Sequence, residues 1–85
     1  MAEYKVYFRE SVEKDLRAIP KKVVKYILQG IGLLTAEPRP PGGEKLTGRE
    51  RYRLRQGRYR IVYSIQDNEL TVWVVRVVHR KDIYH

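Results

Sequence analysis

The spacing of apolar residues changes from helical to strand-like at a break rich in proline and glycine. Over residues 11–34 apolar residues recur every three or four positions, which is typical of helices that bury one face. Over residues 52–65 apolar and polar residues mostly alternate, which is typical of strands with one buried face. The break itself, residues 37–43, contains three prolines and two glycines and predicts a loop. The chain therefore predicts an α+β fold in which helices cover a sheet.

One strand and two helices are expected before the break. Residues 4–8 alternate, with Tyr4, Val6 and Phe8 on one face, and predict a half-buried strand. Ser11 is the expected N-cap of a first helix that carries apolar residues from position 12 to position 19. Pro20 ends that helix and can begin a second one, whose apolar stripe runs over residues 23–34.

Three strands are expected after the break, at hairpin spacing. The first covers Tyr52 to Arg55, and a turn at Gln56-Gly57 leads to a second strand over Arg58 to Ile65. Asp67-Asn68 predicts a two-residue hairpin turn. The last strand, Leu70 to Val78, is nearly all apolar, so we expect it to be central and covered on both sides. The order is β-α-α-β-β-β in a single domain over residues 1–85, with both helices on one face of a small, mainly antiparallel sheet.

The positive charge of the chain is concentrated on the first of these hairpins. The formal net charge is +8, from 18 Lys and Arg against 10 Asp and Glu. Between Lys45 and Arg60 seven residues are basic and one is acidic. Alternation places the arginines on one face of the hairpin, and the face of Tyr59, Ile61 and Tyr63 is the one that the helices should cover. A one-sided basic surface of this kind is the footprint of a nucleic-acid site.

Composition excludes several other classes of protein. The chain has no cysteine and only two histidines, both near its end, so neither a disulfide framework nor a structural zinc site is expected. No run approaches the roughly 20 apolar residues that span a bilayer, and residues 1–5 show no signal-peptide pattern, so we expect a soluble cytoplasmic protein. Trp73, on the last strand, is interpreted as a core residue, and Asp15 as part of the solvated side of the first helix.

Several short motifs, taken in order, resemble the RelE/ParE superfamily, the toxins of type II toxin–antitoxin pairs. The residues that carry the resemblance are Lys45-Leu46-Thr47-Gly48, Tyr52-Arg53-Leu54-Arg55, Tyr59-Arg60-Ile61-Val62-Tyr63 and the terminal His79-Arg80-Lys81-Asp82-Ile83-Tyr84. The order of strands and helices matches over essentially the full length. Each motif alone is weak, because arginine-rich hairpins are common, but their order and spacing together are fairly specific.

The resemblance implies a ribosome-dependent ribonuclease of the RelE type, which cuts mRNA in the A site without a metal or other cofactor. It carries catalytic positions onto five residues of this chain: Arg53, Arg55, Arg60, Arg80 and Tyr84. Attack by a ribose 2′-OH requires a proton acceptor, a proton donor and cations around the phosphorane-like transition state. Arginine is always charged and its planar fork matches phosphate oxygens, so the hairpin arginines suit charge stabilisation.

The identity of the general base is left open by the sequence. Relatives of the RelE type often have lysine where this chain has Arg53 and Arg55, and an arginine cannot give up its proton. The base is therefore either Tyr84 or His79. Lys45, Arg51 and Arg58 are expected to make auxiliary contacts with RNA phosphates.

The resemblance also implies partners and alternatives. The expected partner is an acidic, RelB-like antitoxin, and operator DNA would be bound only through the complex with it. Ribosome and mRNA are the expected targets, and no membrane is involved. A ParE-like toxin, which shares the fold but poisons DNA gyrase without nuclease chemistry, is the main alternative. A third possibility is an inert member that binds only RNA or its antitoxin, because phosphate binding needs the same arginines.

Overall fold

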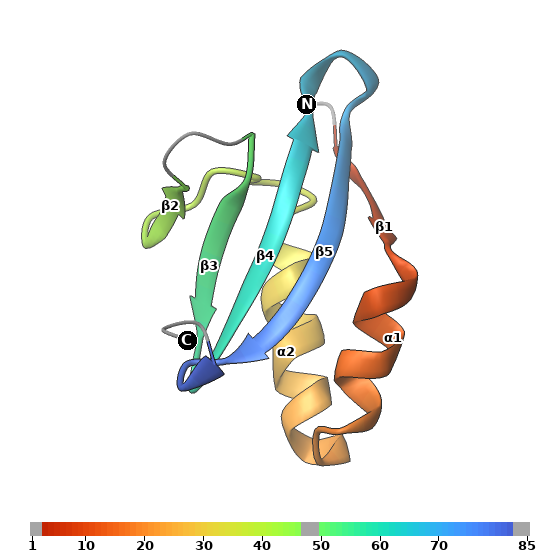
Figure 1. Cartoon of the computed structure of the whole chain (residues 1–85). Coiled ribbons are helices and arrows are strands. Elements are labelled where there is room, and N and C mark those ends of the chain that lie inside the picture. Colours follow the sequence, from red (N-terminus) through yellow and green to blue (C-terminus); the bar gives the residue numbers. More distant parts are fainter. Residues whose placement is uncertain (1–2, 47–49, 83–85) are drawn as a thin grey trace.

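The computed structural model describes residues 3–46 and 50–82 of the chain. Two helices are followed by four strands, and a further strand precedes them (Figure 1). In chain order the elements are β1 (Lys5–Phe8), α1 (Glu10–Arg17), α2 (Lys21–Leu33), β2 (Gly43–Lys45), β3 (Tyr52–Gln56), β4 (Tyr59–Gln66), the short 3₁₀ helix η1 (Asp67–Glu69) and β5 (Thr71–His79).

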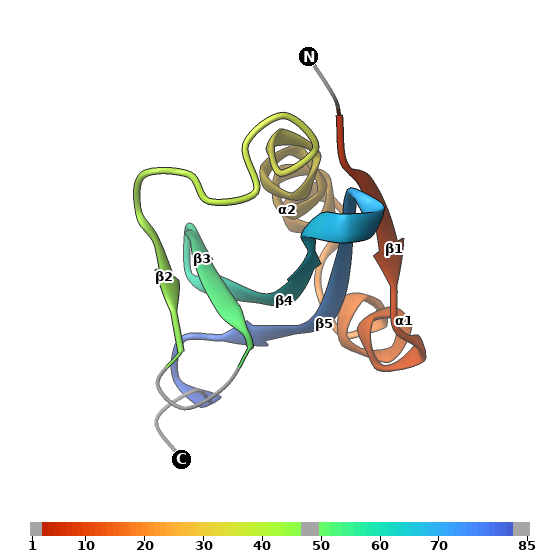
Figure 2. The same cartoon turned by 90° about the horizontal axis from the view of Figure 1, so that it is seen from above.

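The five strands form one mixed sheet in the order β1-β5-β4-β3-β2. β1 runs parallel to β5, and the other neighbours are antiparallel. Viewed from above, the sheet is strongly curved, with β1 and β2 at its two edges (Figure 2). The predicted α+β class is confirmed, but β2 was not predicted. Its sequence, Gly-Glu-Lys, has no apolar alternation, and it is held as a strand by pairing with β3.

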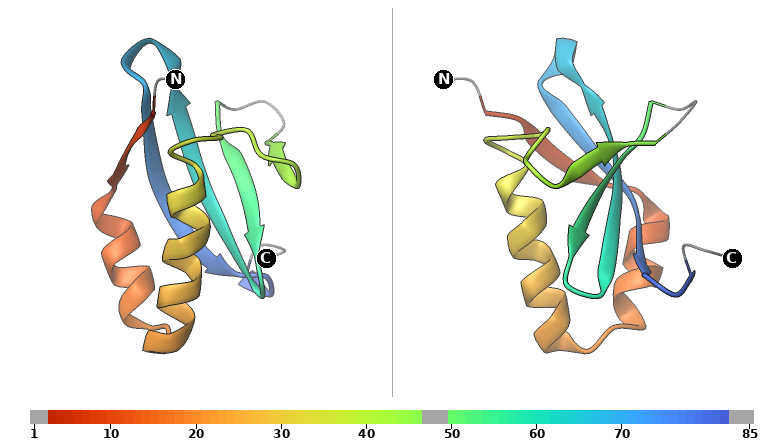
Figure 3. Two further views of the ribbon diagram at one scale, coloured as in Figure 1. Left: turned by 180° about the vertical axis from the view of Figure 1, so that it is seen from behind. Right: turned by 90° about the vertical axis from the view of Figure 1, so that its left-hand side faces the viewer.

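Both helices pack against the sheet, and their apolar stripes meet the apolar face of the strands. α2 lies across β3 and β4, and α1 lies along β5 (Figure 3). The core side chains come from both helices and from three strands: Val12, Ile27, Ile31, Leu54, Ile61, Tyr63, Val72, Val74 and Val77. Alternation along β3 and β4 then directs Arg53, Arg55 and Arg60 to the other side of the sheet, here termed the outer face.

The first helix begins earlier than predicted, and two of its polar side chains complete the edge of the sheet. α1 starts at Glu10 with Arg9 as N-cap, so the prediction of Ser11 as the N-cap was wrong. β1 pairs with β5 only as far as Val74, and α1 occupies the edge beyond it. There the Ser11 hydroxyl donates to the carbonyl of Val75 (2.6 Å), and Asp15 accepts from the amide of Val77 (2.9 Å). Asp15 therefore satisfies a backbone donor at the sheet edge and is not a solvated helix residue.

Both predicted hairpin turns are displaced from their expected positions. Gln56 pairs with Tyr59, so the first turn is Gly57–Arg58, where Gly57 has a φ of 62° that favours glycine. The second connection is not the two-residue turn expected at Asp67-Asn68. It is the 3₁₀ helix η1 followed by Leu70 in the left-handed region (φ 50°).

The last strand is interior to the sheet but covered by helices on one side only. Its register with β4 shifts, because Val62 pairs with Arg76 and Tyr63 with Val74, and a bulge at Val75 results. The interpretation of Trp73 as a core residue was wrong. Trp73 pairs with Ser64, lies on the outer face and is only partly buried. Among the described residues, no helix is long and apolar enough to cross a membrane.

Candidate functional site

A hollow on the outer face, where β2, β3 and β4 lie side by side, gathers three of the predicted arginines. Its volume is about 240 Å³, and we term it the arginine hollow. The residues that line it are Gly42, Glu44, Arg53, Arg55 and Arg60. Three fixed positive charges thus converge on one small space, which the sequence alone could not establish.

Strand register explains why these side chains meet. Arg55 on β3 stands directly opposite Arg60 on β4, and Glu44 on β2 stands opposite Arg53. Their neighbours Leu54 and Ile61 are buried on the helix side, so alternation directs the charged side chains to the outer face. Like charges that face each other across a pair of strands repel, and an anion between them would relieve this repulsion.

Arg60 is the most unusual of these residues because it is both charged and buried. It is 9% exposed, and its Nη1 donates to two backbone carbonyls, those of Gly57 (3.2 Å) and Tyr59 (3.1 Å). Within residues 3–46 and 50–82, neither Arg60 nor Arg55 forms an ion pair with a carboxylate. A buried cation without a counter-ion is costly, so the hollow is suited to receive an anion.

Glu44 is a candidate functional residue that sequence reasoning missed. Its carboxylate forms an ion pair with the Nη2 of Arg53 and lines the same hollow. The carboxylate remains about half exposed, at 56% of its side-chain surface, so it is open to a ligand in the hollow. The only sequence signal was an acidic residue just before a basic hairpin, and that signal gives no face or register.

The segment that leads into β2 is anchored by a polar network at the other end of the sheet. Arg39 donates to both carboxylate oxygens of Asp67 (3.1 and 2.9 Å), and the Tyr63 hydroxyl donates to the carbonyl of Pro38 (2.8 Å). Hydrogen bonds from Arg39 and Tyr4 hold the pKa of Asp67 below its usual value, while burial raises the pKa of Tyr63 to about 12. These contacts fix the loop that carries Gly42 and leads into β2, the strand that carries Glu44.

Other predicted site residues lie outside the lining of the hollow. Lys45 pairs with Glu50 (3.3 Å), and Arg58 is exposed in the β3–β4 turn. Arg51 is partly buried just before β3. The side chain of Arg80 is exposed, and its backbone amide donates to the carbonyl of Arg58 (2.8 Å), which places it beside that turn.

Tyr84, the other predicted C-terminal site residue, lies outside the described residues.

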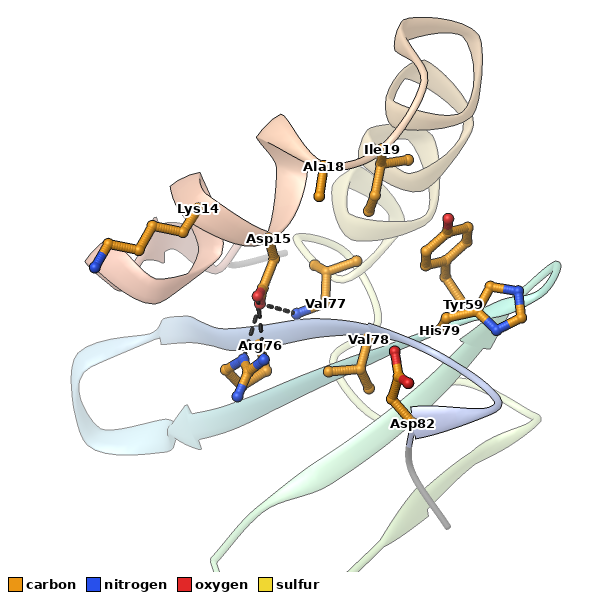
Figure 4. Close-up of a pocket in the computed structure, with 10 residues that line it drawn as sticks. All are labelled: Lys14, Asp15, Ala18, Ile19, Tyr59, Arg76, Val77, Val78, His79 and Asp82. Atoms are coloured by element: carbon orange, nitrogen blue, oxygen red, sulfur yellow. Dashed lines mark hydrogen bonds and ion pairs between the residues drawn. The ribbon is translucent and has the colours of Figure 1, made fainter. Parts of the chain in front are cut away.

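His79 lies in a different hollow, on the helix side of the sheet (Figure 4). This histidine hollow has a volume of about 370 Å³ and is lined by Lys14, Asp15, Ala18, Ile19, Tyr59, Arg76, Val77, Val78, His79 and Asp82. His79 packs edge-on against Tyr59, with ring centroids 5.2 Å apart, and its Nδ1 accepts from the amide of Lys81 (3.2 Å). Because Tyr59 and Arg60 are consecutive on β4, His79 and the arginine hollow lie on opposite faces of the sheet.

Sequence and structure comparisons relate the chain to known toxins. Residues 6–84 match the family model described as the ParE toxin of the type II toxin–antitoxin system parDE. Toxin RelG of Mycobacterium tuberculosis is 34% identical over 85 residues, which covers 95% of this chain and 95% of RelG.

Solved structures show the same likeness. One chain of the toxin–antitoxin complex RelBE2 from Mycobacterium tuberculosis has a TM-score of 0.82 and 30% identity, covering 93% of this chain and 100% of that chain. A chain of the archaeal RelE–RelB complex from Pyrococcus horikoshii has a TM-score of 0.80 and 29% identity, covering 91% and 94%. The isolated E. coli RelE toxin has a TM-score of 0.77 and 26% identity, covering 95% and 90%.

Proposed function

The chain belongs to the RelE/ParE superfamily of type II toxin–antitoxin toxins, and we propose that it is a ribosome-dependent endoribonuclease of the RelE type. In this proposal the toxin cuts mRNA in the A site by attack of a ribose 2′-OH on the adjacent phosphate, without a metal. The observation that carries the proposal is the convergence of Arg53, Arg55 and Arg60 on one hollow, where two of them have no carboxylate partner among the described residues.

Arg55 and Arg60 would stabilise the negative charge that develops on the phosphate. A guanidinium can donate two parallel hydrogen bonds to phosphate oxygens, and its charge does not depend on pH near neutrality. Arg60 is already fixed by the carbonyls of Gly57 and Tyr59, so little reorganisation is needed when the transition state forms.

Glu44 is the proposed proton acceptor. Among the described residues that line the arginine hollow, its carboxylate is the group that can take the proton of the attacking 2′-OH, because arginines cannot. Arg53 would hold this carboxylate in place through their ion pair. Arg80 and Tyr84 remain candidates for the leaving-group side of the reaction, and Tyr84 would have to supply a proton to the 5′-oxygen.

The proposed partner is an acidic, RelB-like antitoxin. The similar structures include RelE chains solved together with RelB antitoxins. A net charge of +8 would speed the association with an acidic partner and make it sensitive to salt. Operator DNA would be bound through the complex, and the toxin would act in the cytoplasm, where the ribosome and mRNA are found.

Primer extension on mRNA from cells in which the protein has been induced tests this function. We expect growth arrest with new 5′ ends inside codons that disappear when translation is blocked. Cells in which the variant Arg55→Ala is induced should grow normally and keep their transcripts intact. Because Arg55 is exposed, the substitution should leave the fold unaffected.

A ParE-like gyrase inhibitor is the second candidate, since the matching family model is that of the ParE toxin. That activity has no evident need for a carboxylate within a cluster of arginines. Intact transcripts together with gyrase-linked DNA breaks in the induced cells would establish this alternative and reject the nuclease.

A further inference from the structure

Two aromatic rings and a guanidinium lie together on the outer face, at the β1–β5 side of the sheet. Tyr7 on β1 is the register partner of Trp73 on β5, and their rings stack with centroids 5.1 Å apart at 30°. The guanidinium carbon of Arg9 lies over the Trp73 ring, 4.5 Å from its centroid. This group, here termed the aromatic stack, is not part of the hydrophobic core.

The aromatic stack remains open to solvent. Tyr7 is 45% exposed and Arg9 is exposed, while Trp73 is partly buried between them. Among the described residues, Arg9 and its neighbour Lys5 form no ion pair. An exposed tyrosine and an arginine without an acidic partner among the described residues contribute little to the stability of the fold in this arrangement.

The aromatic stack and the arginine hollow share one face of the sheet. Trp73 stands opposite Ser64 on β4, and Arg60 lies four residues earlier on the same strand and the same side. Four residues of strand span roughly 13 Å, and one strand spacing adds about 5 Å across the sheet. A strand of RNA with its phosphate in the hollow could therefore reach the stack within a few nucleotides.

We propose that the aromatic stack is a second RNA subsite, which holds a base of the single strand whose phosphate occupies the arginine hollow. The base would stack on the exposed ring of Tyr7, and Arg9 would contact the adjoining phosphate. Cations that follow a backbone, combined with aromatic rings that accept bases, are how proteins bind single-stranded nucleic acid. This inference rests on the proposed function, because it takes RNA as the ligand of the hollow.

Binding is measured apart from cleavage by using an RNA that cannot react. The probe is a single-stranded RNA of about ten nucleotides with 2′-O-methyl groups on every sugar, within the length range that such grooves bind. The chain contains one tryptophan, so its emission reports on Trp73 alone. Binding is followed by the anisotropy of a labelled copy of the RNA, and Trp73 emission is recorded with an unlabelled copy.

The decisive variants are Tyr7→Ala and Phe8→Ala. Both side chains are 45% exposed and adjacent on β1, but they point to opposite faces of the strand. We expect saturable quenching of Trp73 emission in the wild type, about tenfold weaker binding for Tyr7→Ala, and near wild-type binding for Phe8→Ala and Tyr7→Phe.

Where the wild type binds the RNA, two results would overturn the subsite. One is RNA binding that leaves Trp73 emission unchanged, and the other is an equal effect of Tyr7→Ala and Phe8→Ala on affinity. Either result leaves the nuclease standing if primer extension still shows cleavage. Conversely, stacking without cleavage in cells would retain the subsite and reject the nuclease, while a wild type that binds no RNA rejects the subsite.

Discussion

The arginine hollow and the histidine hollow lie on opposite faces of the sheet, both include residues of β4, and their charges are arranged differently. In the histidine hollow, Asp15 takes two hydrogen bonds from Arg76 (2.9 and 3.1 Å) and one from the amide of Val77. Among the described residues that line the arginine hollow, three cations share one carboxylate, that of Glu44. The carboxylate of Asp15 is thus fully paired within the histidine hollow, whereas the described residues of the arginine hollow leave an excess of positive charge.

This difference separates a candidate structural site from a candidate catalytic one. The histidine hollow is the larger, at about 370 Å³ against about 240 Å³, and it contains the histidine that sequence reasoning offered as a base. The larger volume and the presence of a histidine therefore favour the histidine hollow as the catalytic site, whereas the unbalanced charge favours the arginine hollow. Charge balance is the better guide, because a buried charge such as that of Arg60 is costly unless a ligand supplies its partner.

Removing Arg60 should produce the largest effect. Arg60→Ala is expected to lower ribosome-dependent cleavage about 100- to 1,000-fold, because it removes a pre-positioned donor to the transition state. His79→Ala should stay close to the wild-type rate, since His79 faces the other hollow. Cleavage by purified protein is measured by gel electrophoresis of labelled mRNA on ribosomes.

Arg60 also donates a hydrogen bond to the carbonyl of Gly57 in the β3–β4 turn, so its loss can lower stability. The thermal unfolding of Arg60→Ala must therefore be measured together with its activity. Arg55→Ala serves as the second variant, because Arg55 is exposed. A rate for His79→Ala as low as that for Arg55→Ala would reverse the assignment of the two hollows.

Glu44→Gln tests the carboxylate of the arginine hollow. The substitution keeps the shape of the side chain but removes its capacity to accept a proton, and cleavage should fall about 100-fold. Glu50→Gln is the matched control, since Glu50 is exposed and pairs with Lys45 outside the hollow. Equal activity of Glu44→Gln and Glu50→Gln in single-turnover cleavage would show that Glu44 is not the general base.

Asp15→Ala should affect stability and leave the chemistry intact. Asp15 is only 13% exposed at its side chain and accepts three hydrogen bonds, so its loss is expected to cost about 2 kcal/mol. Glu13→Ala, on the same helix, breaks an exposed pair with Arg17 and should cost less than about 0.5 kcal/mol. Urea unfolding gives both values. If the cleavage rate of folded Asp15→Ala falls as much as that of Glu44→Gln, the histidine hollow has a direct role in cleavage.

Asp67→Asn should give the smallest effect, and one that depends on pH. Arg39 and Tyr4 lower the pKa of Asp67 in the folded state, so the ionised carboxylate stabilises the fold. This stabilisation is complete above the unfolded pKa of about 3.9 and is lost as the pH falls through the lower folded pKa. Wild type should therefore unfold at a higher temperature than Asp67→Asn at pH 7, and the gap should close in acid. If the difference in unfolding temperature is the same at both pH values, the Arg39–Asp67 pair is not its cause.

Much of the fold could be predicted because apolar periodicity is a local signal. The alternation through Tyr59, Ile61 and Tyr63 correctly indicated which face the helices cover, and with it the face of Arg53, Arg55 and Arg60. The displaced turns at Gly57 and Asp67 did not alter this result, because a strand keeps its faces when its ends move by one residue.

What could not be predicted depends on pairing between distant segments. Glu44 joins the hollow only because β2 pairs with β3, and three residues without apolar alternation carry no signal of a strand. The bulge at Val75 reverses alternation along β5, so the apolar run gave no indication that Trp73 faces outward. His79 was proposed as a base from its position in the sequence, which cannot distinguish the two faces of a strand.

The most direct test of the arginine hollow as a nuclease site is the chemistry of the ends that it leaves. Attack by the 2′-OH must produce a 2′,3′-cyclic phosphate on one fragment and a 5′-hydroxyl on the other. Purified protein, ribosomes and a defined mRNA should give these ends with the wild type and with His79→Ala, and almost none with Arg55→Ala or Arg60→Ala. Intact mRNA with the wild type, or equal cleavage by wild type and Arg55→Ala, would contradict the account.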